Sequence, residues 1–208
     1  MLYLKHCITD HTSIAIWKVE EPEEDLLSQI SRQEWIENIH EIKSPSRRLE
    51  ILCARILIRE LTGEEKEVYY NDSGKPFLAD HSYHISVSHT RGYVAVAINK
   101  TKDIGLDIEQ ISDKIKRVRS RLIASDEYIN DDKELIHLLL HWSAKEAMFK
   151  FLDAEGVDFL NHLFVGRFEP ESAGTFSASE TRTKHRYNFI ARYQVEPDFV
   201  LVCLEANS

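Results

Sequence analysis

Acidic residues in two parts of the sequence are spaced so that they could hold a cation together. Asp107 and Glu109 lie two residues apart within an apolar, β-branched run, and on a β-strand such residues project to the same side. Glu146 and Lys150 follow Trp142 at successive steps of four residues, which places all three on one face of a helix. Clustered carboxylates favour a hard cation with oxygen ligands. A third carboxylate with a lysine one turn away indicates phosphate chemistry beside that cation.

Both patterns also have simpler explanations. An Asp-x-Glu pair at the end of a strand can be a solvated edge, and Glu146–Lys150 can be an ordinary surface ion pair worth about 0.3–0.5 kcal/mol. The apolar neighbours Leu106 and Ile108 indicate that at least one carboxylate of the strand pair is partly buried. A buried carboxylate needs a partner, and a metal ion would supply it.

Two further motifs are suited to phosphate contacts. The sequence Gly74-Lys75-Pro76 forms a glycine turn that carries a lysine, and Ser88-His89 stands at the mouth of a predicted hairpin. The lysine, hydroxyl and imidazole could each contact phosphate oxygens. The first motif can also be a plain turn, and the second a pair that only forms hydrogen bonds in a loop. A Ser-His nucleophilic dyad is disfavoured, because adjacent residues of a strand point to opposite sides.

Basic residues gather in two places although the chain as a whole is acidic. Arg47 and Arg48 lie at the start of a helix that begins at Ser44-Pro45, and arginines at a helix N-terminus favour anions. A second group alternates with apolar residues and suits an acidic partner helix or nucleic acid. Both groups can instead be solvated helix faces. The second group contains Lys114, Lys116, Arg117, Arg119 and Arg121.

Composition limits the class of protein. The formal net charge of −9 argues against a general nucleic-acid or membrane-surface binder. Cys7, Cys53 and Cys203 are far apart in apolar contexts, which fits neither a disulfide framework nor a zinc site and indicates a reducing compartment. We find no pattern typical of a signal peptide or of a membrane-spanning segment. We therefore expect a cytoplasmic protein.

The elements that must position these residues alternate between helices and short strands. Periodicity predicts strands at 2–8 and 13–19, helices at 26–39 and from 45 to Thr62-Gly63, and a hairpin over 84–99. After a strand at 104–108 it predicts a basic amphipathic segment at 112–122, a long helix at 133–151 and a final antiparallel sheet. This order is typical of an α+β protein. We place the boundary between two halves so that they comprise residues 1–100 and 101–208.

In this order the motifs resemble those of the 4′-phosphopantetheinyl transferase superfamily, and in particular its longer, surfactin-synthetase-activating type. The resemblance covers about residues 45 to 150 and implies a pseudo-dimer of two similar α+β halves, with coenzyme A in the cleft between them. It departs from that type in the second helix, where Ile51 or Leu52 replaces an expected threonine. The motifs that carry the resemblance are residues 74–76, 86–89, 105–109 and 142–150.

The resemblance also implies roles for individual residues. Asp107, Glu109 and Glu146 would bind Mg²⁺ together with the pyrophosphate of coenzyme A, and Lys150 would contact the reacting phosphate. The nucleotide and its phosphates would be held by Arg47, Arg48, Lys75, Pro76, Ser88 and His89.

The expected reaction transfers 4′-phosphopantetheine to a serine of an apo acyl or peptidyl carrier protein and releases 3′,5′-ADP. The base would be Glu146 or a water linked to the metal. The basic group around residues 114–121 would bind the acidic carrier, and the protein would act as a monomer. Two alternatives stay open. One is a non-catalytic module that binds carrier proteins, and the other is a Mg²⁺-dependent phosphohydrolase that uses the same carboxylates.

Overall fold

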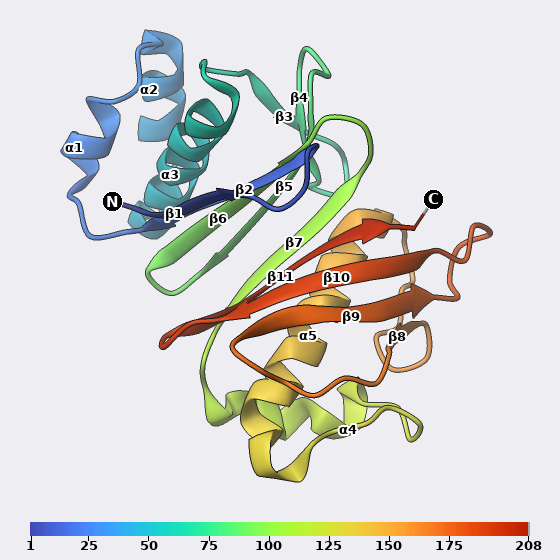
Figure 1. Ribbon diagram of the computed structural model, residues 1–208. Coiled ribbons are helices and arrows are strands. Elements are labelled where there is room, and N and C mark those ends of the chain that lie inside the picture. Colours follow the sequence, from blue (N-terminus) through green and yellow to red (C-terminus); the bar gives the residue numbers. More distant parts are fainter. Residues whose placement is uncertain (208) are drawn as a thin grey trace.

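The computed structural model describes residues 1–207 (Figure 1). Ser208, the last residue of the second predicted half, lies outside the described residues. Every strand pairing found among residues 1–207 is antiparallel, and helices lie beside the sheets, so the fold class is mixed α and β as predicted. No helix among residues 1–207 is long and apolar enough to cross a bilayer.

The first sheet contains four of the strands up to Asn99, in the order β1-β2-β6-β5. Helix α3 covers one face of this sheet, and the short helices α1 and α2 lie beside α3 (Figure 1). Strands β3 and β4 form a separate small ribbon. The elements are β1 (Leu2–Cys7), β2 (Thr12–Lys18), α1 (Glu23–Leu27), α2 (Gln33–His40), α3 (Pro45–Thr62), β3 (Val68–Tyr70), β4 (Pro76–Leu78), β5 (His84–Thr90) and β6 (Tyr93–Asn99).

Helix α3 starts and ends where the sequence predicts. The Ser44 side chain accepts a hydrogen bond from the backbone amide of Arg47, Pro45 occupies the first turn, and Gly63 ends the helix with a φ of 85°. The helix predicted over 26–39 is wrong in one respect, because it is broken into α1 and α2. Tertiary partners hold the intervening backbone: Arg59 donates to the carbonyl of Gln29, and the amide of Ser31 donates to Glu65.

The second sheet contains the strands from Ile104 onward, in the order β7-β11-β10-β9-β8. Helix α5 packs on one face of it, against β7 and β11 above all. The basic segment predicted at 112–122 forms a 3-10 helix followed by one helical turn. The elements are β7 (Ile104–Gln110), η1 (Asp113–Val118), α4 (Arg119–Leu122), η2 (Asp131–Lys133), α5 (Glu134–Leu152), β8 (Leu163–Val165), β9 (Ala173–Glu180), β10 (Asn188–Val195) and β11 (Phe199–Ala206).

The two sheets share a core that lies between them. Alternate side chains of β2 and β6, such as Ile16 and Ala95, pack against those of β7 and β11, such as Leu106 and Leu201. The opposite faces of these strands pack on α3 and on α5. Residues 1–207 are therefore layered in the order α3, first sheet, second sheet, α5. This burial on both faces explains why β6 has no exposed residue.

The edge strands of the two sheets, β5 and β7, meet through hydroxyl groups. The backbone amides of Leu106, Ile108 and Gln110 donate to the side-chain oxygens of Ser86, Ser88 and Thr90, at 3.0, 3.3 and 3.1 Å. The constant offset of twenty residues means that the two strands run parallel. The hydroxyls thus satisfy the amides of an edge strand, and they bring the Ser88 region of one sheet beside the Asp107 region of the other.

Candidate active site

The site forms where strand β7 and helix α5 come very close together. A Cβ atom added to Gly105 would lie 2.2 Å from the backbone oxygen of Ala147, which is too close for any other residue. This glycine therefore permits the close approach of strand and helix. It sets the alternate side chains of β7, Asp107 and Glu109, against the helix face that carries Trp142, Glu146 and Lys150.

Asp107 is the most enclosed acidic residue of the site, with 3% of its surface exposed. Its Oδ1 accepts hydrogen bonds from Ser88 Oγ at 2.9 Å and from Lys150 Nζ at 2.7 Å. Its Oδ2 is buried and has no hydrogen-bond partner among residues 1–207. A buried carboxylate oxygen without a partner is costly, so this atom is a natural point of attachment for a cation.

Lys150 reaches across to β7 instead of pairing along its own helix. Besides Asp107, its ammonium donates to Ser88 Oγ at 2.8 Å and to the carbonyl of Leu106 at 3.3 Å. Within the described part of the chain it forms no ion pair with Glu146. The explanation of Glu146–Lys150 as an ordinary surface pair is therefore wrong.

The two glutamates are partly buried in an environment that disfavours their charged forms. Burial, and then the nearby Asp107 carboxylate, raises the pKa of Glu146 to about 7. The same two causes raise the pKa of Glu109, although its Oε1 accepts a 2.7 Å hydrogen bond from Trp142 Nε1 that opposes the shift. Trp142 thus orients Glu109 while Lys150 holds Asp107. The three acidic residues are close enough to repel one another.

These residues fit a hard divalent cation in chemistry, although they are not drawn together into a closed set of ligands. No group of three or more His, Cys, Asp or Glu side chains is arranged as a metal centre in residues 1–207. The donor set nevertheless consists of carboxylate oxygens alone, as Mg²⁺ prefers. Asp107 Oδ2 is an oxygen without a partner among the described residues. A bound cation would also offset the burial and the repulsion from Asp107 that raise the pKa of both glutamates. Asp107, Glu109 and Glu146 stay our predicted ligands.

Ser88 and His89 point to opposite sides of β5, as expected for neighbours in a strand. Ser88 is buried, and its hydroxyl is engaged by Asp107, Lys150 and the amide of Ile108. In this arrangement Ser88 supports the carboxylate instead of facing open space. His89 is half exposed and approaches Glu50 at 3.4 Å. Its separation from Ser88 agrees with the prediction that a Ser-His dyad is disfavoured.

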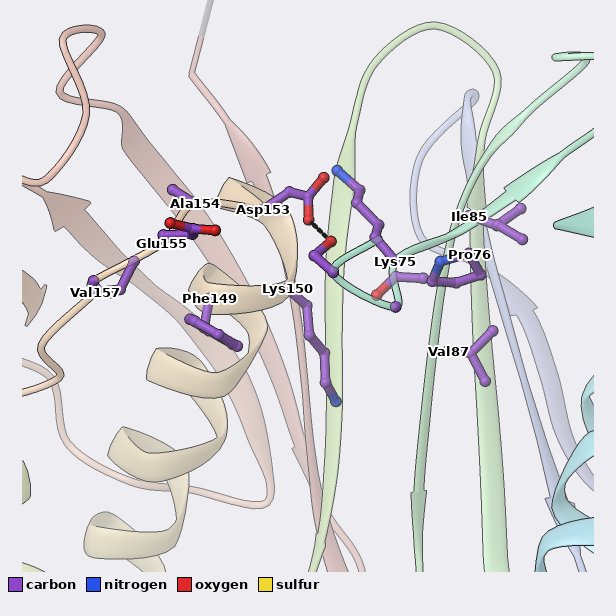
Figure 2. A pocket seen from close by; sticks show the side chains of 14 residues that line it. Lys75, Pro76, Ile85, Val87, Phe149, Lys150, Asp153, Ala154, Glu155 and Val157 are labelled. Carbon is purple, nitrogen blue, oxygen red and sulfur yellow. Dashed lines mark hydrogen bonds between the residues drawn. The ribbon is translucent and has the colours of Figure 1, made fainter. Parts of the chain in front are cut away.

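A cavity of about 470 Å³ opens beside Lys150. Figure 2 shows its two walls: Phe149, Lys150 and Asp153 come from the end of α5, and Lys75, Pro76, Ile85 and Val87 come from the first half of the chain. Lysines from both walls therefore border one cavity, whose remaining lining is largely apolar apart from two serines and the carboxylates of Asp153 and Glu155. A ligand with phosphates and an uncharged arm would suit this mixture.

A smaller cavity of about 170 Å³ adjoins the first, and both are lined by Gly74, Pro76 and Val87. Arg47 and His89 line the smaller cavity. Burial lowers the pKa of His89, and Arg47 and Lys150 lower it further, against the opposing effect of Glu50. Glu50, which also lines this cavity, lies next to the His89 ring and pairs with Arg47 at 3.0 Å. The smaller cavity is therefore bordered by a cation, an imidazole and one carboxylate.

Arg48 differs from its neighbour Arg47. Its Nε donates to both carboxylate oxygens of Glu23 at 2.8 and 2.9 Å, and its Nη1 donates to the carbonyl of Ile42 at 2.9 Å. These contacts tie α3 to α1, and Arg48 lines neither of the two cavities. The structure therefore brings Arg47, Lys75, Pro76 and His89 to the cavities but gives Arg48 a place in the packing of the helices.

A buried ion pair that we did not predict connects α5 to the irregular segment that precedes it. Lys145 is 0% exposed, and its ammonium donates to Glu127 at 2.7 Å and to the carbonyls of Leu122 and Phe159 at 2.6 and 3.0 Å. Burial lowers the pKa of Lys145, and Glu127 opposes that shift. A lysine within the apolar part of α5 is the sequence signal for such a pair. Its partner lies in an irregular segment, where periodicity gives no indication of it.

The basic residues of η1 and α4 fall into two groups. Lys116 and Arg119 both pair with Glu134 at the start of α5. Lys114, Arg117 and Arg121 are exposed and form no ion pair within residues 1–207. The three unpaired cations are available for an external partner.

Comparison with known families supports part of the resemblance. Residues 103–203 match the family model of the 4′-phosphopantetheinyl transferase superfamily. Strand β7 and helix α5 lie within this segment, so all three predicted metal ligands and Lys150 belong to it. The cavity walls from the first half lie outside it. A comparison with curated proteins finds no match for the chain.

Proposed function

We propose that this protein is a Mg²⁺-dependent 4′-phosphopantetheinyl transferase that uses coenzyme A and modifies a serine of an apo acyl or peptidyl carrier protein. One observation carries the proposal: within the segment that matches the superfamily, β7 and α5 place Asp107, Glu109 and Glu146 near one another and near Lys150. Lys150 pairs with Asp107 and borders a cavity that a second lysine, Lys75, also lines. The layered pair of sheets is in keeping with a pseudo-dimer of the surfactin-synthetase-activating type.

Asp107, Glu109 and Glu146 would hold the metal, each for a different structural reason. Asp107 offers its unpartnered Oδ2 while Ser88 and Lys150 hold its other oxygen. Trp142 holds one oxygen of Glu109 and leaves the other for a ligand. Mg²⁺ held there would offset the negative charge of the pyrophosphate of coenzyme A, whose bridging P–O bond breaks in the transfer.

The transfer step needs a base for the attacking serine and a positive charge near the leaving group. The serine oxygen of the carrier would attack the phosphorus that bears the pantetheine arm, and the bond from that phosphorus to 3′,5′-ADP would break. Glu146 or a water linked to the metal would accept the serine proton, and burial together with the nearby Asp107 makes Glu146 a more basic carboxylate than an exposed one. The ammonium of Lys150 would offset negative charge on the departing phosphate.

Binding of coenzyme A would fall mainly to the first half of the chain. Lys75 and Pro76 line the larger cavity, and Arg47 and His89 line the smaller one. Two adjoining cavities with cations in each suit a molecule that carries a pyrophosphate and a separate 3′-phosphate. The carrier protein would approach the unpaired cations Lys114, Arg117 and Arg121, which lie on the segment that packs beside α5.

The proposed function is tested by mass spectrometry of apo carrier proteins after reaction with coenzyme A. A carrier should gain the mass of one phosphopantetheine group when Mg²⁺ is present and stay unchanged when EDTA replaces it. Absence of the gain across a panel of apo carriers would refute the proposal. The alternatives make different predictions: a phosphohydrolase would release free phosphopantetheine without a carrier, and a binding module would retain carrier affinity without Mg²⁺.

A further inference from the structure

The turn that precedes Pro76 is tied to the end of α5 across the larger cavity. Asn71 Nδ2 donates to Asp153 Oδ2 at 2.6 Å, and Ser73 Oγ donates to Asp153 Oδ1. Figure 2 shows a hydrogen bond at Asp153 that links the helix wall to the opposite wall. The partners are about eighty residues apart in the chain, so these contacts depend on the tertiary fold alone.

Asp153 holds the residue around which the turn is built. The backbone carbonyl of Asn71 accepts a hydrogen bond from the amide of Gly74 at 2.9 Å. Asn71 Oδ1 accepts a second one from the amide of Lys75 at 2.8 Å. Ser73 Oγ also lies 2.6 Å from Asn71 Oδ1. Both side chains bonded by Asp153 therefore belong to the hydrogen-bond network that shapes the turn.

The side chain of Lys75 also reaches from the turn to the end of α5. Its ammonium donates to the carbonyl of Phe151 at 3.1 Å and lies 3.5 Å from Asp103. Phe151 is in the last turn of α5, where free carbonyls and the helix dipole attract a cation. Three donors from the first half thus converge on the C-terminal end of α5.

The backbone of Asp153 is adapted to this position at some cost. It ends α5 in the left-handed conformation with a φ of 49°, a conformation that glycine or asparagine adopts with less strain than most residues. An aspartate here adds a carboxylate beside a cavity that Lys75 and Lys150 border. A negative charge at this position disfavours phosphate binding. We therefore expect the carboxylate to serve another purpose.

We propose that Asp153 is a positioning residue for coenzyme A: it ties the 71–75 turn across the cleft and so places Lys75 on the wall opposite Lys150. The inference rests on the proposed function in that the bound molecule is coenzyme A. The hydrogen bonds hold two walls, one from the turn between β3 and β4 and the other from the end of α5, at a set separation. Part of the cost of ordering the turn is thereby met before the substrate binds.

The tie and simple electrostatics predict opposite effects for loss of the carboxylate. If Asp153 only adds negative charge, its removal should strengthen the binding of an anionic substrate. If it positions the turn, removal should weaken binding, because the turn must then be ordered by the substrate itself. The direction of the change in KM for coenzyme A therefore decides between the two.

The experiment compares Asp153→Gly with Asp153→Asn. Glycine suits the left-handed backbone and removes both acceptors. Asparagine suits it too, removes the charge, and can still bond Asn71 and Ser73 through its amide group. We expect Asp153→Gly to raise the KM for coenzyme A about tenfold with kcat little changed, and Asp153→Asn to stay within about twofold of the wild type.

Hydrogen exchange without substrate tests the tie independently of catalysis. The amides of Gly74 and Lys75 should exchange faster in Asp153→Gly than in the wild type or in Asp103→Asn, a control that removes a carboxylate near Lys75 without touching Asn71 or Ser73. An unchanged exchange rate, or a lower KM in Asp153→Gly, would overturn the inference. A wild-type protein without transferase activity would refute the proposed function, while the exchange experiment would still decide whether the tie exists.

Discussion

The two walls of the cleft are built in different ways. The wall formed by β7 and α5 is tightly packed: Gly105 touches the helix backbone, Asp107 is buried, and Lys150 and Ser88 share one carboxylate oxygen. The wall formed by the first half combines part of β5 with the turn before β4 and the start of α3, and Arg47 and the residues around Gly74 are largely exposed. The first wall holds its side chains in place before any ligand binds, whereas the second depends on a few polar contacts.

This difference matches the tasks that we propose for the two walls. Groups that act on a reacting phosphate must be oriented in advance, because reorganisation during the reaction is costly. Groups that hold the nucleotide tolerate more adjustment, and the contacts of Asp153 with the 71–75 turn order them only in part before binding. The predictions below test this division, beginning with the wall formed by β7 and α5.

Loss of the Asp107 charge should have the largest effect. Asp107→Asn keeps the size of the side chain but weakens the attraction for both Lys150 and Mg²⁺, so we expect transfer to fall by roughly 10²–10³. The rate of carrier modification measures this, with circular dichroism to verify the fold. The control is Asp72→Asn, an exposed carboxylate on the turn of the other wall. Equal rates for the two variants would contradict the division between the walls.

Gly105→Ala should separate β7 from α5. The new Cβ would meet the backbone of Ala147, which cannot move aside as a flexible side chain could. We expect a loss of about 1–3 kcal/mol in the free energy of unfolding and a larger loss of activity than the change in stability explains. Denaturant unfolding and transfer assays measure the two effects. Wild-type activity in this variant would show that the close approach is not needed for the site.

The pKa of Glu146 makes two predictions about pH. Its value of about 7 exceeds the ordinary 4.5, so its contribution to stability is present below 4.5 and is lost as the pH rises through 7. Without Mg²⁺, the wild type should therefore lose thermal stability over this range more than Glu146→Gln does.

Binding of Mg²⁺ needs the ionised form of Glu146, so the affinity for Mg²⁺ should rise by up to about tenfold per pH unit below 7. Titration calorimetry with Mg²⁺ at pH 6 and 8 measures this affinity. Equal affinities at the two pH values would show that Glu146 is not a ligand.

Arg47 and Arg48 should behave differently although they are neighbours. Arg47→Ala removes a cation from the smaller cavity, and we expect the KM for coenzyme A to rise by about tenfold without a change in stability. Arg48→Ala removes the contacts to Glu23 and Ile42, so we expect a lower midpoint of thermal unfolding and an unchanged KM. The opposite pattern would place Arg48 in the binding site after all.

The smallest effect should come from the surface that we propose for the carrier. Reversing the charge of Lys114, Arg117 and Arg121 should raise the KM for an acidic carrier several-fold at low salt, and the effect should shrink as salt screens it. The control reverses Lys116 and Arg119, which already pair with Glu134. A KM that does not depend on salt would argue against this docking surface.

Local patterns predicted much of the framework. The Ser44-Pro45 start and the Gly63 end of α3, and the hairpin of β5 and β6, follow from capping and alternation. The break between α1 and α2 was missed, because Arg59 and Glu65 hold that backbone from distant positions. The partner of Lys145 was missed for the same reason, since Glu127 lies in an irregular segment.

The sequence by itself determined which residues share a face. A period of two places Asp107 with Glu109, and a period near four places Trp142, Glu146 and Lys150 together, whatever the remainder of the fold. Only the tertiary structure decided their partners: Lys150 pairs with Asp107 instead of Glu146, and Trp142 with Glu109. The physical reason is that spacing along one element determines direction, whereas partners depend on which elements pack together. That packing depends on contacts such as the one at Gly105 and the hydroxyl bonds between β5 and β7.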